Sequence, residues 1–281
     1  MKYVATSMIE QQAPPPAVAR KWNGARITGN LLMVFWLLAG IALVWYLFSA
    51  WSPSKVDRYG VKYLTGLLTT IQLVVISITM GAILSIPIAF ARMSSNKIIG
   101  AIAYGYVYLF RGTPLLVQLF LIYFGLGAFL AEYRGIFQEY GLWKYLREAW
   151  YYALLAFTLN TAAYQAEILR GAIESVPKGQ WEGASALGIS KVLAFRKIIL
   201  PQALIVALRP YGNEIVLMLK GSAIVALVTV LDLMGETRRA FSQTYDFQAY
   251  IWAAVFYLIM VESLRNVWSW LEQRLTRHLK R

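Results

Sequence analysis

The stretch from Glu174 to Pro201 reads ESVPKGQWEGASALGISKVLAFRKIILP and separates two long apolar runs of the chain. Pro177 interrupts the backbone near its start, while Gly188 and Ser190 supply a helix stop followed by a helix cap. The spacing predicts a short helix over Gln180–Leu187 and a second helix that runs to the end of the stretch. A short helix therefore projects from an apolar bundle, flanked by turns.

Three apolar residues of this predicted helix, Trp181, Ala184 and Leu187, follow one another at positions i, i+3 and i+6. Residues at this spacing lie on one side of a helix. We therefore expect a small apolar face that the groove of a partner protein would bury. Taken alone, the same pattern is also typical of a generic amphipathic surface loop.

The sequence on both sides of this stretch is rich in long apolar runs. Hydrophobic residues make up 59% of the 281 residues and the mean hydropathy is +0.53, whereas a soluble globular domain has roughly 45–50% apolar residues. We therefore predict an all-α membrane protein with about six transmembrane helices in the lipid bilayer. Six runs reach the roughly 20 residues that a spanning helix needs, the fifth of them broken: Asn30–Ala50, Gly66–Ala91, Gly100–Leu130, Tyr152–Gly171, Pro201–Leu231 and Ala249–Leu271.

The formal net charge of +13 reflects where lysine and arginine lie along the chain. They concentrate in the N-terminal tail, in the connections after the second and fourth runs, and in the C-terminal tail, whereas the other connections mix basic and acidic residues. The positive-inside rule places the basic segments in the cytoplasm, which predicts that both termini are cytoplasmic. Because the basic residues form no continuous stripe with stacking aromatics, we expect no binding of nucleic acid.

Residue types needed for several kinds of chemistry are missing from the sequence. Cysteine is absent and the single histidine, His278, lies in the basic tail, which excludes disulfides, iron–sulfur clusters and cysteine-ligated zinc. No Gly-x-x-x-x-Gly-Lys-[Ser/Thr] sequence occurs, so the chain lacks the loop and lysine that hold ATP phosphates. We predict no metal site and no cofactor in this chain.

Polar residues interrupt the third run at Arg111-Gly-Thr-Pro. An ionisable side chain at membrane depth costs about 2.5–3.5 kcal/mol on insertion scales, so it normally faces a bundle interior or a cavity. Pro114 removes a backbone donor and Gly112 permits close approach, so we expect the helix to kink there. The kink either lines a substrate pathway, with Arg111 and Thr113 as lining residues, or only shapes the bundle.

The broken fifth run carries a second polar group at Asn213, Glu214 and Met218. Residues at i and i+4 share a helix face, and Glu214 lies about 20 Å along the helix from Pro201, well inside a roughly 30 Å apolar core. We therefore interpret Glu214 as a pathway residue that attracts the cationic end of a substrate. The alternative is an internal ion pair with one of three basic residues: Arg209, Arg111 or Lys220.

Two polar residues of the fourth run, Asn160 and Tyr164, are further pathway candidates. Together with Thr161 and Gln165, they would either face the same cavity as Glu214 or form hydrogen bonds that hold neighbouring helices to each other.

The ends of the last two runs carry charges as well. Lys220–Ser222 should break the fifth run, leaving Ala223–Leu231 as a re-entrant or interfacial piece. Glu262 and Arg265, spaced i and i+3, are expected to pair with each other.

The loop between the fourth and fifth runs resembles the Glu-Ala-Ala signature of bacterial ATP-binding-cassette import permeases. The matching pattern is Glu182, Gly183, Ala184, three residues, Gly188, nine residues, Ile198, one residue, Leu200 and Pro201. Gly183 departs from it, standing where alanine is usual. Glu167 and four further segments resemble the polar amino-acid permeases, especially the histidine, lysine, arginine and opine branch. The segments are Phe110–Gln118, Ala156–Tyr164, Arg170–Pro177 and Tyr211–Lys220.

This resemblance implies the type I importer permease fold, which has a five-helix core. The core would occupy residues 62–275, with a coupling loop at 174–200. Residues 1–29 would form a cytoplasmic tail, residues 30–61 an extra N-terminal transmembrane helix with a periplasmic loop, and residues 276–281 a basic cytoplasmic tail. The location implied is the bacterial inner membrane.

The resemblance also implies that the short helix is a coupling helix that docks into a groove on a separate ATPase. Glu182 is the main expected contact, although a carboxylate in the first turn also favours the helix dipole by a few tenths of a kcal/mol to about 1 kcal/mol. The expected set of coupling residues is Gln180, Trp181, Glu182, Ala184, Leu187 and Gly188.

The function implied is that of a permease subunit that moves polar, basic amino acids or opine-like derivatives inward without catalysing a reaction itself. Its partners would be a second permease chain, with a heterodimer favoured over a homodimer, two ATPase subunits that bind ATP and magnesium, and a periplasmic binding protein. The alternatives are an ion-coupled secondary carrier, which usually shows repeated halves, and a structural or signalling membrane protein, which leaves Glu214 and Lys220 unexplained.

The charge distribution leads to a prediction about orientation. Reporter proteins fused after Arg281 and before the first run should both be active on the cytoplasmic side, because the basic tails stay inside. A C-terminal reporter that is active in the periplasm would contradict the six-span arrangement.

Overall fold

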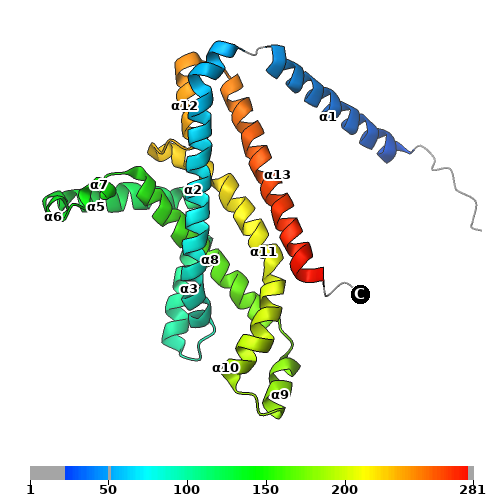
Figure 1. Cartoon of the computed structure of the whole chain (residues 1–281), viewed down its shortest axis with the longest axis vertical. Helices are drawn as coiled ribbons and strands as arrows, with labels where there is room; N and C mark the ends of the chain where they lie inside the picture. Colours follow the sequence, from blue (N-terminus) through cyan, green and yellow to red (C-terminus); the bar gives the residue numbers. More distant parts are fainter. Residues whose placement is uncertain (1–22, 50–51, 278–281) are drawn as a thin grey trace, which may run out of the picture. The chain divides into compact units, whose positions relative to one another are not determined.

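The computed structural model describes residues 23–49 and 52–277, and all regular elements within them are helices. The chain divides into two compact units, one up to Ser52 and one from Pro53 onward. The predicted tail up to residue 22 and the basic end from His278 lie outside the described residues. Figure 1 shows the helices with the labels used below.

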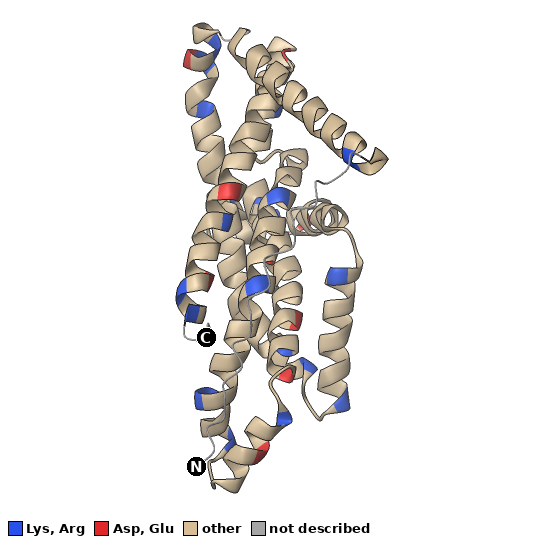
Figure 2. Cartoon of the chain, turned by 90° about the vertical axis from the view of Figure 1, so that its right-hand side faces the viewer, with Lys and Arg blue, Asp and Glu red and all other residues tan. Residues whose placement is uncertain are grey.

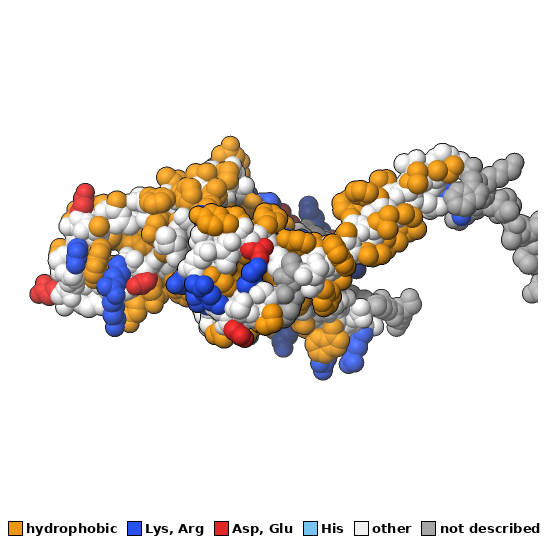
Figure 3. Space-filling view, turned by 90° about the horizontal axis from the view of Figure 1, so that it is seen from above, with side chains coloured by type: hydrophobic (Ala, Val, Ile, Leu, Met, Phe, Trp, Pro, Cys, Tyr) orange, Lys and Arg blue, Asp and Glu red, His pale blue; other side chains and the backbone are white. Residues whose placement is uncertain are grey.

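The described residues of the first unit form one helix, α1 (Gly24–Ser49). Its 26 residues span about 39 Å at 1.5 Å per residue, which is enough to cross an apolar core of about 30 Å. Large hydrophobic side chains such as Trp36 and Trp45 are exposed along it, and Figure 3 shows it covered mainly by hydrophobic side chains. This surface is suited to lipid, and the helix agrees with the first predicted run.

The second unit is organised around α2 (Pro53–Arg92) and α8 (Ala149–Glu174), which form its most extensive helix pair. Helix α2 is continuous over 40 residues and already begins at Pro53. The predicted periplasmic connection before residue 62 is therefore largely helical. Helix α8 also contacts α11 and α3, so it lies at the centre of this unit.

The third predicted run is two helical pieces rather than one span. Helix α3 (Lys97–Gly112) ends at the expected break, and α4 (Leu115–Phe120) begins after Pro114. The chain continues through a π-helix at Leu121–Leu126 and α5 (Gly127–Glu132). The prediction of one span over Gly100–Leu130 was wrong, because Pro114 has no N–H to continue the ladder and the backbone at Thr113 is extended.

Short and long helices then alternate to the end of the chain. Figure 1 shows α5, α6 and α7 extending to one side of α2 and α8, and α9 and α10 at the end of the second unit opposite α12. The remaining bounds are α6 (Arg134–Glu139), α7 (Trp143–Leu146), α9 (Lys178–Ala186), α10 (Lys191–Ala194), a π-helix (Phe195–Ile199), α11 (Leu200–Gly221), a 3-10 helix (Ser222–Val228), α12 (Leu233–Thr244) and α13 (Gln248–Thr276).

Four helical stretches of the described residues are long and apolar enough to cross a membrane: α1, α2, Leu115–Glu132 and α13. A fifth is possible if the pieces Lys191–Val228 and Leu233–Thr244, bent by 48°, form one broken span. This is fewer than the six predicted. The predicted span Tyr152–Gly171 does fold as a helix, α8, but its buried polar residues make it too polar to qualify, because a helix at the centre of a bundle faces protein rather than lipid.

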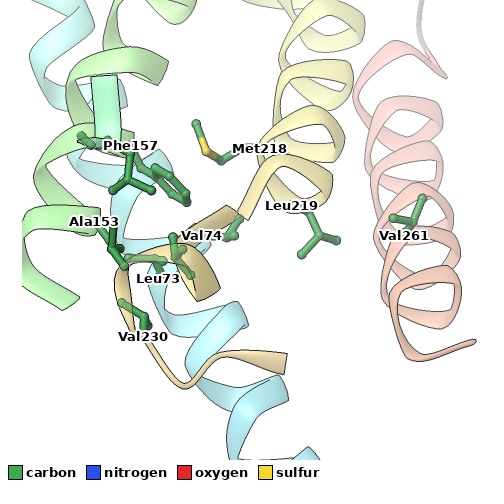
Figure 4. Close-up of a cluster of buried hydrophobic side chains, with 12 residues drawn as sticks. Leu73, Val74, Ala153, Phe157, Met218, Leu219, Val230 and Val261 are labelled. Atoms are coloured by element: carbon green, nitrogen blue, oxygen red, sulfur yellow. The ribbon is translucent and has the colours of Figure 1, made fainter. Parts of the chain in front are cut away.

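An apolar core joins α2, α8 and α11 with the residues that follow α11. Phe157 of α8 and Leu73 of α2 are fully buried in it, together with Met218 of α11. Figure 4 shows these side chains meeting between the helices. Between α2 and α8 the backbones come close at Gly81, where an added Cβ would lie 2.4 Å from Cγ2 of Thr161.

This close approach predicts that Gly81→Ala destabilises the protein. The added methyl group would push against a fully buried β-branched side chain and the α8 backbone, which should cost about 1–3 kcal/mol. The matched control is Gly105→Ala in α3, where nothing lies within 4 Å of the added Cβ. Thermal unfolding in detergent should show a lower Tm for Gly81→Ala alone, and equal Tm values for both variants would contradict the packing described.

Candidate functional site

The loop after α8 forms the predicted short helix with nearly the predicted bounds. Helix α9 begins at Lys178, directly after Pro177, and ends before Gly188, which has a φ of +68°. The N–H of Ile189 donates to the carbonyl of Ala184 and the N–H of Gly188 to that of Ser185, each at 3.0 Å. This pairing is the Schellman motif that terminates helices with a left-handed residue, so the predicted helix stop is confirmed.

The apolar face of α9 is turned toward the chain itself. The ring of Trp181 stacks on Phe195, with centroids 6.4 Å apart and planes 24° apart, and Ala184 is only 3% exposed. Leu187 is 79% exposed. The prediction that all three residues present one face to a partner was therefore wrong for two of them, because Phe195 from the returning chain covers that side.

The outward side of α9 consists of short and polar residues. Gln180 and Glu182 are exposed, as is Gly183, and nothing lies within 4 Å of a Cβ added at Gly183. Ser190 caps α10 by accepting the N–H of Leu193 at 3.4 Å, as predicted. Figure 2 shows basic and acidic residues near one another along the ribbon at this end of the second unit.

The break between α3 and α4 is held by two buried amides. The carbonyl of Phe110 would normally accept a hydrogen bond from residue 114, but proline has no N–H. Instead it accepts one from Nε2 of Gln118 at 2.8 Å and one from Nδ2 of Asn160 at 3.1 Å. Asn160 also donates to Oε1 of Gln118 at 2.9 Å, and Gln118 donates to Oγ1 of Thr113 at 2.8 Å. Asn160 and Thr113 therefore stabilise the broken helix, which favours the hydrogen-bonding alternative for Asn160.

A second buried network joins α2, α8 and α11. Thr161 donates to Oε1 of Glu214 at 2.9 Å, and Nε2 of Gln165 reaches Oγ1 of Thr161 at 3.0 Å and the carbonyl of Ile78 at 3.2 Å. Gln165 is fully buried, and its Oε1 has no hydrogen-bond partner within the described part of the chain. Glu214 is 6% exposed. Carboxylate, hydroxyl and amide thus converge at the centre of the bundle.

The neighbours predicted for Glu214 lie elsewhere. Asn213 is exposed on another side of α11, and Met218 packs in the apolar core instead of lining a polar pathway. The prediction that the three side chains act together was wrong, because adjacent helical residues point about 100° apart and the residues of α2 and α8 that surround Met218 are apolar.

The basic residues considered as partners of Glu214 are engaged otherwise or exposed. Nε of Arg209 lies 2.6 Å from Oε1 of Glu272, Arg111 lies near Glu167, and Lys220 is exposed. Among the ion pairs of the described residues none includes Glu214. In contrast, the predicted pair of Arg265 and Glu262 is present, with Nη1 and Oε1 2.8 Å apart.

Glu167 of α8 is the centre of a charge cluster whose role the sequence did not reveal. Its carboxylate contacts Nε of Arg92 at 2.9 Å, Nη2 of Arg170 at 2.9 Å and Nη1 of Arg111 at 3.7 Å. Nη1 of Arg170 also contacts Oε2 of Glu174 at 2.6 Å. The spacing of Glu167, Arg170 and Glu174 at i, i+3 and i+7 is a signal for part of this cluster, but Arg92 and Arg111 come from other helices.

Acidic residues at the opposite end of the unit have structural partners. Asp232 is fully buried and caps α12 by accepting the N–H of Gly235 at 2.8 Å. Asp246, in the turn before α13, pairs with Lys55 at the start of α2. The hydrogen bond from Lys55 holds the pKa of Asp246 below its usual range. These residues join α2 to the last two helices.

The chain is similar in sequence to membrane components of transport systems. The sequence profile described as "Binding-protein-dependent transport system inner membrane component" matches residues 78–281. The nopaline transport system permease protein NocM of Agrobacterium fabrum is 44% identical over 200 residues, covering 71% of this chain and 81% of the relative. The histidine/lysine/arginine/ornithine transport system permease protein HisM of Escherichia coli is 41% identical over 217 residues, covering 77% and 90%.

Solved structures agree with the sequence relatives. One chain of the crystal structure of an amino acid ABC transporter with histidines superimposes with a TM-score of 0.69 at 34% identity, covering 80% of this chain and 99% of that one. A chain of the MetNI methionine ABC transporter in an inward-facing conformation gives a TM-score of 0.62 at 16% identity, covering 76% and 96%. The second match shows a shared fold.

The amide network at the helix break predicts that Asn160→Leu destabilises the protein. The substitution keeps the approximate size but leaves the buried oxygen of Gln118 without this donor, which should cost about 1–3 kcal/mol. Asn266→Leu, on the exposed side of α13, is the control. The Tm in detergent should fall for Asn160→Leu only. An unchanged Tm combined with a changed substrate preference would point to a pathway role instead.

Proposed function

Since the chain belongs to the family of binding-protein-dependent transport system inner membrane components, we propose that it is the permease subunit of an ATP-driven importer of polar amino acids, in particular basic amino acids or opine-like derivatives. The relatives that support this substrate class are permeases for nopaline, octopine, arginine, and histidine, lysine, arginine and ornithine. The buried carboxyl group of Glu214 is suited to pair with the cationic part of such substrates.

The observation that carries the proposal is the outward side of α9. This helix connects directly to the central helix α8 and lies at one end of the unit (Figure 1). Its inward side is fixed by Trp181 and Ala184, while Gln180, Glu182 and Leu187 stay exposed. A helix anchored on one side and polar on the other is suited to transmit the movement of a docked ATPase to α8.

The proposed transporter contains further chains besides this one. Hydrolysis of ATP, with magnesium, takes place on two separate cytoplasmic ATPase subunits, and this chain contributes no catalytic residue and no cofactor. A second permease chain completes the pathway, with a heterodimer favoured, and a periplasmic binding protein delivers the substrate. The complex resides in the bacterial inner membrane with both termini of this chain in the cytoplasm.

Reconstitution in liposomes tests the function. Vesicles containing this chain, a second permease, the ATPase and a substrate-loaded binding protein should accumulate arginine when ATP is supplied to the ATPase side. Leaving out the ATPase should abolish uptake. Uptake that persists without the ATPase and follows an imposed ion gradient would identify a secondary carrier and contradict the proposal.

The exposed position of Glu182 predicts that Glu182→Lys weakens association with the ATPase. A reversed charge on the docking side would meet the groove unfavourably, whereas the inward packing of α9 is untouched. Glu139→Lys, an exposed residue of α6, makes the same charge change far from α9 and is the control. Co-purified ATPase should decrease for Glu182→Lys only. An undiminished yield of ATPase with Glu182→Lys would contradict the docking role.

The buried carboxylate predicts that Glu214→Gln lowers transport of basic amino acids more than that of neutral ones. The substitution keeps size and a hydrogen-bond acceptor for Thr161 but removes the charge, and a partly desolvated charge pair contributes about 1 kcal/mol or more. Glu262→Gln, in an exposed pair, is the control. Transport should be compared at equal expression. A wild-type ratio of basic to neutral uptake would show that Glu214 has a structural role.

A further inference from the structure

The guanidinium of Arg111 lies near the carboxylate of Glu167 on α8 and beside the ring of Tyr164 on the same helix. Arg111 stands just before the break that ends α3 at Gly112. Its Nη1 is 3.7 Å from Oε2 of Glu167, and its Cζ is 5.2 Å from the ring centre of Tyr164. The same guanidinium also acts electrostatically on Glu214 of α11. Arg111 therefore contacts one carboxyl group directly and acts on a second one through its charge.

Helix α8 spaces the groups around Arg111 regularly. Thr161, Tyr164 and Glu167 follow one another at intervals of three residues, so they are neighbours on the helix surface, each about 4.5 Å further along the axis. Thr161 is the residue that donates to Glu214. Tyr164 therefore lies on α8 between Thr161, which holds Glu214, and Glu167, and the guanidinium of Arg111 lies against the Tyr164 ring.

Glu167 and Glu214 differ in the number of arginines that bind their carboxyl groups. Glu167 is already bound by Arg92 and Arg170, each at 2.9 Å, whereas Arg111 stays beyond hydrogen-bonding distance and its side chain is 43% exposed. Glu214 is buried and accepts one hydrogen bond, from Thr161, and it belongs to none of the ion pairs found within residues 23–49 and 52–277. A buried carboxylate without a cation is unfavourable, so Glu214 is the better destination for Arg111.

We propose that Arg111 changes partner during the transport cycle, pairing with Glu167 in one state and with Glu214 in the other while its guanidinium moves over the ring of Tyr164. Arg111 stands in the last turn of α3, directly before the break at residues 112–114, so its side chain can change direction while the amides hold the break. A cationic substrate at Glu214 replaces Arg111, which then stays with Glu167. The inference rests on the proposed function and assigns Arg111 as a positioning residue.

The exchange connects the pathway to the coupling helix. Glu167 binds Arg170, and Arg170 binds Glu174, the last residue of α8. Helix α9 begins four residues later, at Lys178. The charge cluster that precedes α9 contains three arginines and two glutamates while Arg111 is near Glu167. When Arg111 leaves Glu167, the cluster loses one positive charge.

Double-mutant cycles in two trapped states test the exchange. The assembled transporter, in nanodiscs, would be compared without nucleotide and after trapping with ATP and vanadate, using Arg111→Gln, Glu167→Gln, Glu214→Gln and the two doubles that contain Arg111→Gln. In one state only, the change in Tm of the Arg111/Glu167 double mutant should differ by about 2–4 °C from the sum of the two single-mutant changes. In the other state, the Arg111/Glu214 double mutant should show this difference. Coupling to the same partner in both states, or to neither partner, overturns the proposal.

A second variant separates positioning from folding. Arg111→Lys keeps the charge but lacks the planar group that lies on Tyr164, so stimulation of ATP hydrolysis by loaded binding protein should be partly retained, whereas Arg111→Gln should lose most of it. The stimulation is expressed per assembled transporter, so poor assembly of Arg111→Gln does not affect the comparison. Equal stimulation in both variants overturns the proposal. Wild-type vesicles that show no ATP-driven uptake refute the proposed function, while normal wild-type uptake without partner exchange refutes this inference alone.

Discussion

The structure depends on one constraint, which is that polar groups at membrane depth must find their partners within the protein. Helix α8 supplies many of these partners to α2, α3 and α11. Asn160 satisfies the carbonyl left open by the break after α3, Thr161 holds the carboxylate of Glu214 on α11, Gln165 reaches the backbone of α2, and Glu167 gathers three arginines. Because α8 continues into the loop that forms α9, the same helix joins the buried polar groups to the surface that we propose docks the ATPase.

Features that depend on local chemistry could be predicted from the sequence. The stop at Gly188 and the cap at Ser190 follow from backbone freedom and side-chain capping, and both are present. The interruption at Pro114 follows from a missing N–H. The pairing of Glu262 with Arg265 follows from their spacing on one helix. Each of these needs information from only a few neighbouring residues.

Features that depend on which helix faces which could not be predicted in this way. Trp181 was expected to face a partner because it shares one side of α9 with the apolar residues Ala184 and Leu187. In the structure the ring of Phe195, which follows α10, stacks on Trp181. Met218 was placed in a polar pathway because it shares a face with Glu214, but α2 and α8 supply apolar neighbours there. The cluster at Glu167 draws Arg92 and Arg111 from two other helices. Pairings of this kind are set by tertiary packing.

Cross-linking shows whether the outward side of α9 joins this chain to an ATPase. The chain has no cysteine of its own, so Glu182→Cys and Ala184→Cys each introduce a single attachment point for a short photo-reactive probe. The account predicts an adduct with the ATPase from position 182, which is exposed, and little from position 184, which is buried against the chain's own helices. An absent adduct at 182, or equal adducts at both positions, would contradict it.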